Sequence, residues 1–127
     1  MFTETETGWT EIKYHKNKFI ENDVLIIVLT DFGVASAGES FVKYLKQLNN
    51  VIFIGTNTAG ILNFCNMGMC NLANSKLEIF MSKTISFEPD FEFREGKGYL
   101  PDFWVNPEKS LDLALKFLDK YMRGELL

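Results

Sequence analysis

Ser36 stands in a run of small residues that could place a nucleophile at the start of a helix. The run Ala35-Ser36-Ala37-Gly38 follows a stretch of aliphatic residues, Val24–Leu29, after a short loop. The first N–H groups of a helix have no acceptor within the helix, so they can stabilise the negative oxygen that develops when a hydroxyl group attacks a carbonyl. We therefore regard Ser36 as a candidate nucleophile for acyl transfer, with the N–H groups of Ala37 and Gly38 as candidate oxyanion donors.

The same residues support a purely structural interpretation. Ser36 and Glu39 have the Ser-x-x-Glu spacing of a capping box, in which the two residues satisfy each other's backbone N–H groups at the start of a helix. Capping boxes are far more common than nucleophilic serines. Taken alone, the spacing therefore favours a helix cap, and only further signals in the sequence would favour catalysis.

Three further segments supply such signals, because they follow Ser36 in a fixed order. Gly55–Gly60 reads Gly-Thr-Asn-Thr-Ala-Gly after a second aliphatic run, Leu72–Ser75 reads Leu-Ala-Asn-Ser, and Glu95–Asp102 reads Glu-Gly-Lys-Gly-Tyr-Leu-Pro-Asp. Together with Ser36, this ordered set resembles the C-terminal half of the catalytic domain of the tail-specific, or C-terminal processing, serine proteases and their tricorn-core relatives. The resemblance covers roughly residues 19–122.

The resemblance implies a fold, an activity and a set of site residues. In this family a Ser-Ala-x-Glu element carries the nucleophile, a Gly-x-x-Thr-x-Gly element follows one strand later, and a Glu-Gly-x-Gly-x-x-Pro-Asp element comes near the end. The implied fold is α/β and ClpP/crotonase-like, with βαβ units, a mixed sheet and a C-terminal helix. The implied reaction is hydrolysis of peptide bonds, without a cofactor or a metal. The implied site consists of Ser36 as nucleophile, Ala37, Gly38, Thr58 and Gly60 around it, and Glu95 as a supporting carboxylate.

The general base is where this sequence departs from the family pattern. In the processing-protease branch a lysine follows directly after Gly-x-x-Thr-x-Gly, but here that position is Ile61. A Ser-Lys dyad would need another lysine, such as Lys83 or Lys97, and nothing in the sequence supports either. The resemblance is therefore to the lysine-free, tricorn-like branch.

In that branch a histidine from far upstream acts as the base and a late glutamate supports it. Glu95 matches the glutamate. The one histidine of this chain, His15, stands about twenty residues before Ser36, which is too close to match the family's base. The better interpretation of His15 is a solvated residue between Tyr14 and Lys16.

Composition excludes several other classes of protein. The chain has 127 residues, of which 46% are hydrophobic and 24% charged, which fits one globular domain rather than a disordered chain. A net charge of −4 without a basic cluster argues against nucleic acid as a partner. The longest apolar run has six residues, far short of a membrane span, and no secretory signal opens the chain. Cys65 and Cys70 are more simply two strand or turn thiols than a local disulfide.

The pattern of apolar residues predicts the elements that position the candidate site. Val24–Leu29 and Val51–Ile54 are expected to be parallel strands, the first buried on both faces in the middle of the sheet. Between them a helix is expected with its apolar stripe on Phe41, Tyr44, Leu45 and Leu48. Strands near 67–72 and 77–81 should pair across 73–76, and residues 88–98 should form a loop. The last helix is expected to start near Pro107 or Ser110, with its apolar stripe on Leu111, Ala114, Leu115, Leu118, Tyr121 and Met122.

Two hypotheses on function follow. The first is a serine peptidase whose chain holds a polar segment, residues 1–18, and the C-terminal portion of the catalytic domain, residues 19–127. Its partners would be a peptide or protein substrate and either a second copy of the chain or the missing N-terminal half of the domain. The second hypothesis is a non-catalytic domain on the same scaffold that binds peptides or assembles with a partner. An acyl-CoA enzyme of the crotonase type ranks last, because it would not explain the Ser-Ala-Gly-Glu and Glu95–Asp102 elements.

Overall fold

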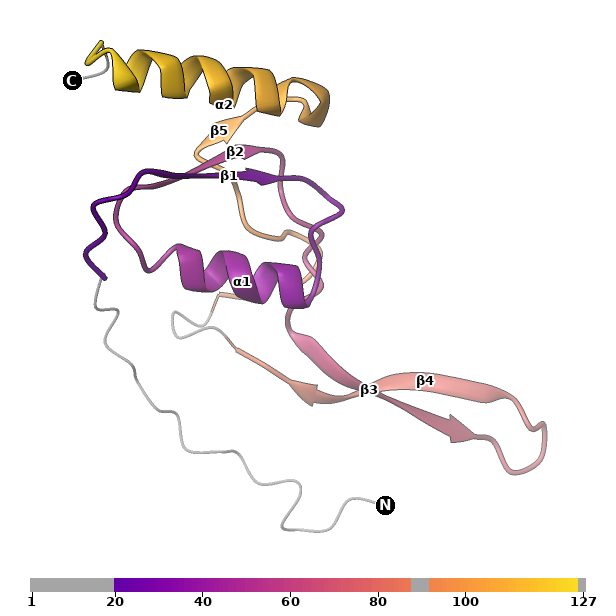
Figure 1. The fold of residues 1–127 in the computed structure, drawn as a ribbon. Helices are drawn as coiled ribbons and strands as arrows, with labels where there is room; N and C mark the ends of the chain where they lie inside the picture. Colours follow the sequence, from indigo (N-terminus) through magenta and orange to yellow (C-terminus); the bar gives the residue numbers. More distant parts are fainter. Residues whose placement is uncertain (1–19, 88–91, 126–127) are drawn as a thin grey trace.

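The computed structural model describes residues 20–87 and 92–125. Within these residues the elements are β1 (Ile26–Thr30), α1 (Ala37–Leu45), β2 (Val51–Gly55), β3 (Phe64–Asn71), β4 (Glu78–Ile85), β5 (Phe103–Trp104) and α2 (Pro107–Met122). The strands β1, β2 and β5 form a parallel sheet in that order (Figure 1). This arrangement confirms the predicted α/β fold with a βαβ unit. The antiparallel pair β3–β4 forms a second sheet of its own rather than extending the first into one mixed sheet.

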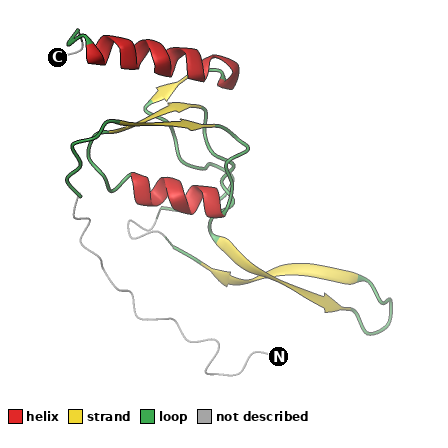
Figure 2. Ribbon diagram, viewed as in Figure 1, coloured by secondary structure: helices red, strands yellow, loops and turns green. Residues whose placement is uncertain are grey.

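The two aliphatic runs form the centre of the parallel sheet. β1 pairs with β2 from Ile26 opposite Val51 to Thr30 opposite Gly55. Helix α1 lies against one face of this sheet and α2 against the other, as Figure 2 shows by the red helices on either side of the yellow strands. β1, however, is an edge strand among the described residues, and its Leu29 is half-exposed. The expected position in the middle of the sheet is therefore wrong here, because only β2 pairs with β1.

Helix α1 buries a face that overlaps only in part with the one predicted, since Leu45 packs against the core. Phe41 and Tyr44 are 62% and 66% exposed, whereas Glu39 and Val42 are buried. Val42 packs with Phe53 in the core, and the inward direction of Glu39 is fixed by hydrogen bonds described below. A prediction based on the spacing of apolar residues alone cannot identify a buried helix face that includes a carboxylate.

Helix α2 begins at Pro107, one of the two predicted starts. Asn106 is its N-cap, and its side chain accepts a hydrogen bond from the N–H of Glu108 at 3.0 Å. The buried residues of α2 are Ser110 and Ala114, so only part of the predicted apolar stripe faces the sheet. Leu111, Leu115 and Met122 are more than half exposed. None of the described helices is long and apolar enough to cross a membrane.

The hairpin β3–β4 extends away from the sheet and confirms the predicted pairing (Figure 1). Its register runs from Phe64 opposite Ile85 to Asn71 opposite Glu78, and the chain reverses between Leu72 and Leu77. Cys65 and Cys70 are both free thiols on β3. Five residues of extended strand separate their Cα atoms by about 16 Å, too far for a disulfide.

The segment before β5 is fastened to β2 through Asp102. The N–H of Phe53 donates to the carboxylate of Asp102 at 2.8 Å, and the N–H of Asp102 donates to the carbonyl of Phe53, also at 2.8 Å. These two bonds make Asp102 the first link between β2 and the short strand β5. They hold the chain that enters β5 beside β2.

Candidate active site

Ser36 lies in a strained turn between β1 and α1. The N–H of Gly38 donates to the carbonyl of Ala35 at 2.9 Å, which closes a four-residue turn with Ser36 at its first central position. Ser36 has φ 50° and ψ −108°, a combination typical of type II′ turns, in which this position usually belongs to glycine. A plain N-cap serine takes β-region dihedrals instead. A side chain at this φ carries a strain of about 1–3 kcal/mol, which only the surrounding structure can maintain.

The buried carboxylate of Glu39 holds this turn from below. Glu39 is 0% exposed, and the two oxygens of its carboxylate accept four hydrogen bonds. Oε2 accepts from the N–H of Ser36 at 3.1 Å and of Ile61 at 2.8 Å. Oε1 accepts from the hydroxyl of Thr58 at 2.5 Å and from the N–H of Gly60 at 2.7 Å. The predicted capping box of Ser36 and Glu39 is therefore present, but the same carboxylate also binds the loop after β2.

Thr58 and Gly60 connect this loop to the segment that carries Glu95. The Thr58 hydroxyl accepts a hydrogen bond from the N–H of Tyr99 at 2.8 Å, and the N–H of Gly96 donates to the carbonyl of Gly60 at 2.7 Å. Gly60 has φ 74°, and a Cβ there would lie 2.6 Å from the backbone nitrogen of Lys97. Only glycine therefore permits the two loops to approach this closely.

Glu95 binds the next two amides of the same loop. Its Oε2 accepts from the N–H of Leu62 at 3.0 Å and of Asn63 at 2.8 Å. Glu39 and Glu95 thus hold the consecutive N–H groups from Gly60 to Asn63 between them. The structure places the six predicted site residues at the start of α1, where Ser36 is the N-cap and Ala37 and Gly38 are the first helical residues, and on the two loops that carry Thr58, Gly60 and Glu95.

The two candidate oxyanion donors, the N–H groups of Ala37 and Gly38, differ in whether an acceptor already binds them. The N–H of Gly38 is occupied by the carbonyl of Ala35, so the expectation that it is free is wrong. This follows from the turn geometry, since closing the turn uses that N–H group. Within the described residues the N–H of Ala37 has no acceptor, and it remains the one candidate donor beside Ser36.

The three lysines considered as bases, Lys46, Lys83 and Lys97, make no hydrogen bond to Ser36 in the described part of the chain. Lys46 is the C-cap of α1, about 15 Å along the helix axis from Ser36. Burial lowers the pKa of Lys46 below its usual 10.5, with Asp102 opposing and Arg94 adding to the shift. Lys83 lies in the hairpin with its stem over Gly68. The amine of Lys97 makes no hydrogen bond to Ser36 in the described part of the chain, and His15 lies outside the described residues.

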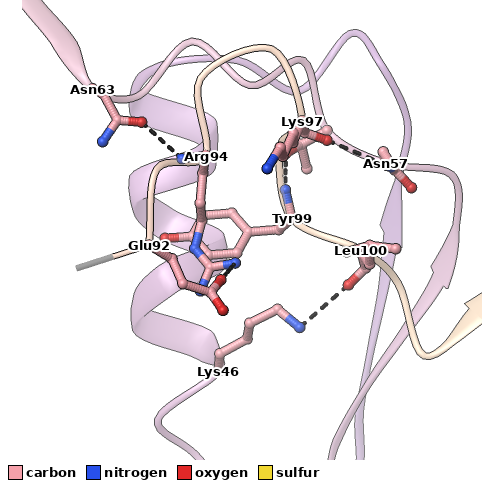
Figure 3. A network of polar contacts seen from close by, with 9 residues as sticks. Lys46, Asn57, Asn63, Glu92, Arg94, Lys97, Tyr99 and Leu100 are labelled. Atoms are coloured by element: carbon pink, nitrogen blue, oxygen red, sulfur yellow. Dashed lines mark hydrogen bonds and ion pairs between the residues drawn. The ribbon is translucent and has the colours of Figure 1, made fainter. Parts of the chain in front are cut away.

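A polar network on the other side of these loops was not predicted from the sequence. Figure 3 shows the Arg94 side chain beside Glu92, with an ion pair of 2.8 Å, and against the ring of Tyr99. The N–H of Arg94 also donates to the side chain of Asn63, whose residue is 1% exposed. Lys46 donates to the carbonyl of Leu100 at 3.3 Å and lies over the Phe53 ring. This network braces the segment that carries Glu95, and it is linked to Ser36 only indirectly, through the hydrogen bonds from Tyr99 to Thr58 and from Thr58 to Glu39.

The described residues contain no cluster of three or more histidine, cysteine, aspartate or glutamate side chains that could hold a metal ion.

Comparison with known proteins shows the family and the fold of the chain. The family model for Peptidase family S41 matches residues 2–105. Among solved structures, mature CPAF in complex with lactacystin matches with a TM-score of 0.61 at 19% identity, over 78% of this chain and 21% of that one. The tricorn protease matches with a TM-score of 0.57 at 24% identity, over 77% and 10%. A putative S41 protease from Bacteroides fragilis matches with a TM-score of 0.51 at 19% identity, over 75% and 28%.

The chain belongs to peptidase family S41, because the family model covers most of its length. This confirms the family to which the sequence motifs pointed. The solved structures, at less than 25% identity, show the ClpP/crotonase-like fold. The chain spans between 10% and 28% of the length of these three proteins.

Proposed function

We propose that this chain carries the nucleophile half of a serine peptidase site, in the lysine-free manner of the tricorn-like branch. The observation that carries the proposal is the backbone of Ser36, at φ 50° and ψ −108° in a turn closed just before α1. A residue that served only as a cap would not need this strain. The turn supports catalysis because it presents a hydroxyl group at a helix N-terminus, as sharp strand-to-helix turns do in other hydrolases.

The reaction would proceed through an acyl-enzyme. The Ser36 hydroxyl attacks the carbonyl carbon of a peptide bond and passes its proton to a base, while the N–H of Ala37 donates to the developing oxyanion. The intermediate collapses when the C–N bond breaks and the base returns the proton to the leaving amine. Water then hydrolyses the ester by the same steps. A second oxyanion donor and the base would come from outside residues 19–127, the portion proposed to be the C-terminal part of the catalytic domain.

Glu95 is suited to orient that base. Its Oε2 is committed to the amides of Leu62 and Asn63, whereas its Oε1 has no hydrogen-bond partner within the described residues. A carboxylate held rigidly by one oxygen can use the other to fix the tautomer of a histidine, which is the role of the third group in catalytic triads. The position after Gly60 holds Ile61, so a lysine is not the proposed base.

Labelling with a fluorophosphonate probe tests this proposal. The purified chain is treated with the probe with and without added imidazole, which can substitute for a missing histidine, and the adduct is read by intact mass. We expect one adduct on Ser36, formed faster with imidazole, and none on Ser36→Ala. Absence of an adduct even with imidazole, or an adduct that persists in Ser36→Ala, would contradict the assignment of Ser36 as nucleophile.

A matched variant separates the role of Glu95 from its role in folding. Glu95→Gln keeps one oxygen for the two amides but replaces the other by an NH2 group, which cannot accept a proton from imidazole. We expect Glu95→Gln to reduce the acceleration by imidazole while leaving the melting temperature nearly unchanged. Equal acceleration in both proteins would remove Glu95 from the proposed site.

A second candidate function, peptide binding without catalysis, rests on the hairpin. Both edges of β3–β4 are unpaired among the described residues, and the side chains of Met67, Met69 and Phe80 are each more than half exposed. An extended peptide could add to such an edge by backbone hydrogen bonds. This function would not depend on Ser36, so binding of peptides that is unchanged in Ser36→Ala, together with no labelling, would favour it over catalysis.

A further inference from the structure

We infer that Glu39 is a positioning residue, whose carboxylate keeps the backbone of Ser36 in its strained conformation and directs the N–H of Ala37 toward the substrate. The inference rests on the proposed function for its catalytic meaning, but the contacts that support it do not depend on that function. They are the burial of Glu39, its four acceptor bonds and the two segments from which the donors come, the turn before α1 and the loop after β2.

The first step of the argument is the geometry of Oε2. This oxygen accepts from the N–H of Ser36 at 3.1 Å and from the N–H of Ile61 at 2.8 Å. One shared acceptor limits the separation of those two nitrogens to about 6 Å, so the turn before α1 and the loop after β2 are held beside each other at that point. The strained residue is therefore bonded directly to a fixed anchor.

The second step is what fixes the anchor itself. Oε1 accepts from the hydroxyl of Thr58 at 2.5 Å and from the N–H of Gly60 at 2.7 Å, and the Thr58 hydroxyl accepts in turn from Tyr99. Bonds of this kind to an ionised carboxylate are about twice as strong as neutral ones. Glu39 therefore cannot rotate without breaking its contacts to the loop after β2.

The third step is that capping alone does not account for Glu39. A capping-box glutamate needs one backbone N–H, normally near the surface, and it reaches back only to the residue three positions earlier. Glu39 is 0% exposed and accepts three further hydrogen bonds from residues about twenty positions away. A buried carboxylate is costly unless it is fully bonded, so this arrangement is specific to the site.

The substitution Glu39→Gln tests the inference with little change in shape. The NH2 group of glutamine is a donor and takes the place of either Oε1 or Oε2. In both orientations it faces at least one N–H group that is bonded to the carboxylate in the wild type. Either Gly60 or the pair Ser36 and Ile61 must then lose its bond. Thr58→Val serves as the comparison, because it removes one partner of Glu39 and leaves the three N–H bonds in place.

Amide hydrogen exchange and the ¹⁵N–¹H spectrum of the 127-residue chain give the first readout. We expect the amides of Ser36, Gly60 and Ile61 to be protected in the wild type. In Glu39→Gln at least one of them should exchange about tenfold faster or more, with a large change in its proton shift. In Thr58→Val the main change should fall on Tyr99. Unchanged protection of all three amides in Glu39→Gln would overturn the inference.

The rate of fluorophosphonate labelling gives the second readout. A displaced nucleophile should slow labelling on the order of 10²-fold in Glu39→Gln. Val42→Ala, which weakens packing on the same helix, is the control for general destabilisation and should leave the rate close to that of the wild type. Equal slowing in both variants would reduce Glu39 to a structural residue. If the wild type itself is not labelled, the proposed nucleophile fails, while the exchange data still decide whether Glu39 holds Ser36.

Discussion

The two helices begin in different ways, and the difference separates a cap from a functional turn. At α2, Asn106 has φ −53° and ψ 130°, accepts from the N–H of Glu108 and is followed by a proline in the first turn. At α1, Ser36 has a positive φ. The acidic residue of the first turn is exposed in α2, where it is Glu108, and fully buried in α1, where it is Glu39.

This comparison shows which sequence signals are ambiguous. Both helices follow the usual rules, with a polar residue at the N-cap and an acidic residue in the first turn. Only α1 combines them with a strained residue and with bonds to distant loops. A Ser-x-x-Glu motif therefore indicates more than a helix cap when its glutamate is buried and the backbone of its serine lies outside the β region.

The largest expected difference between the N-termini of α1 and α2 is in their effect on the reactivity of the chain toward a fluorophosphonate. Ser36→Ala should abolish labelling by a fluorophosphonate, whereas Asn106→Ala should label at the wild-type rate, because within the described residues Asn106 makes its hydrogen bonds to its own helix. Intact mass spectrometry over a time course measures both. Loss of labelling in Asn106→Ala would show that the two ends are not independent and would weaken the comparison.

The next largest difference is in stability. Glu39→Ala leaves one hydroxyl and three N–H groups without their acceptor in the interior, so we expect a loss of about 3 kcal/mol or more in the free energy of unfolding. Glu108→Ala removes an exposed acid near a helix N-terminus and should cost about 0.5 kcal/mol. Urea denaturation followed by circular dichroism gives both values. Similar losses for the two variants would contradict the special role of Glu39.

A smaller effect is expected from the ordinary cap. Asn106→Ala should lower the free energy of unfolding by about 1 kcal/mol, and Asn106→Gly by only a few tenths of that, since glycine is tolerated at an N-cap. The same urea experiment measures them. A loss well above this range would mean that Asn106 has contacts beyond its cap.

The smallest expected effect concerns the strain at Ser36. Because glycine accepts a positive φ without cost, Ser36→Gly should be more stable than Ser36→Ala by about 1 kcal/mol. At Asn106, where φ is negative, the difference in stability between Asn106→Gly and Asn106→Ala should arise from capping alone. Equal stability of Ser36→Gly and Ser36→Ala would show that the turn carries little strain in solution.

The sequence predicted well the parts of the molecule that depend on local pattern. Two aliphatic runs bounded by turn residues predicted β1 and β2, Pro107 predicted the start of α2, and the polar residues 73–76 predicted the hairpin. These features follow from backbone chemistry within a few residues. The family motifs added the position of Ser36 and the membership of the chain in family S41.

The parts that were missed depend on contacts between distant segments. The pairing of Glu39 with Gly60 and Ile61 joins residues about twenty positions apart, and that of Asp102 with Phe53 joins residues 49 apart. No periodicity reports such bonds. One signal was present, however: a charged residue at position 39 in the middle of a stretch of small and apolar residues, Gly33–Val42, is unusual unless it has buried partners.

The hairpin β3–β4 also bears on how the chain behaves in concentrated solution. The hairpin has two eight-residue strands whose outer edges are unpaired among the described residues, and its only charged strand residues, Glu78 and Lys83, both lie on β4. With its exposed apolar side chains it forms a template on which further strands can add. Aggregation should therefore begin at residues 64–85 rather than in the parallel sheet. A lysine in place of Met69 or Phe80 is the change that should raise solubility without touching the turn at Ser36.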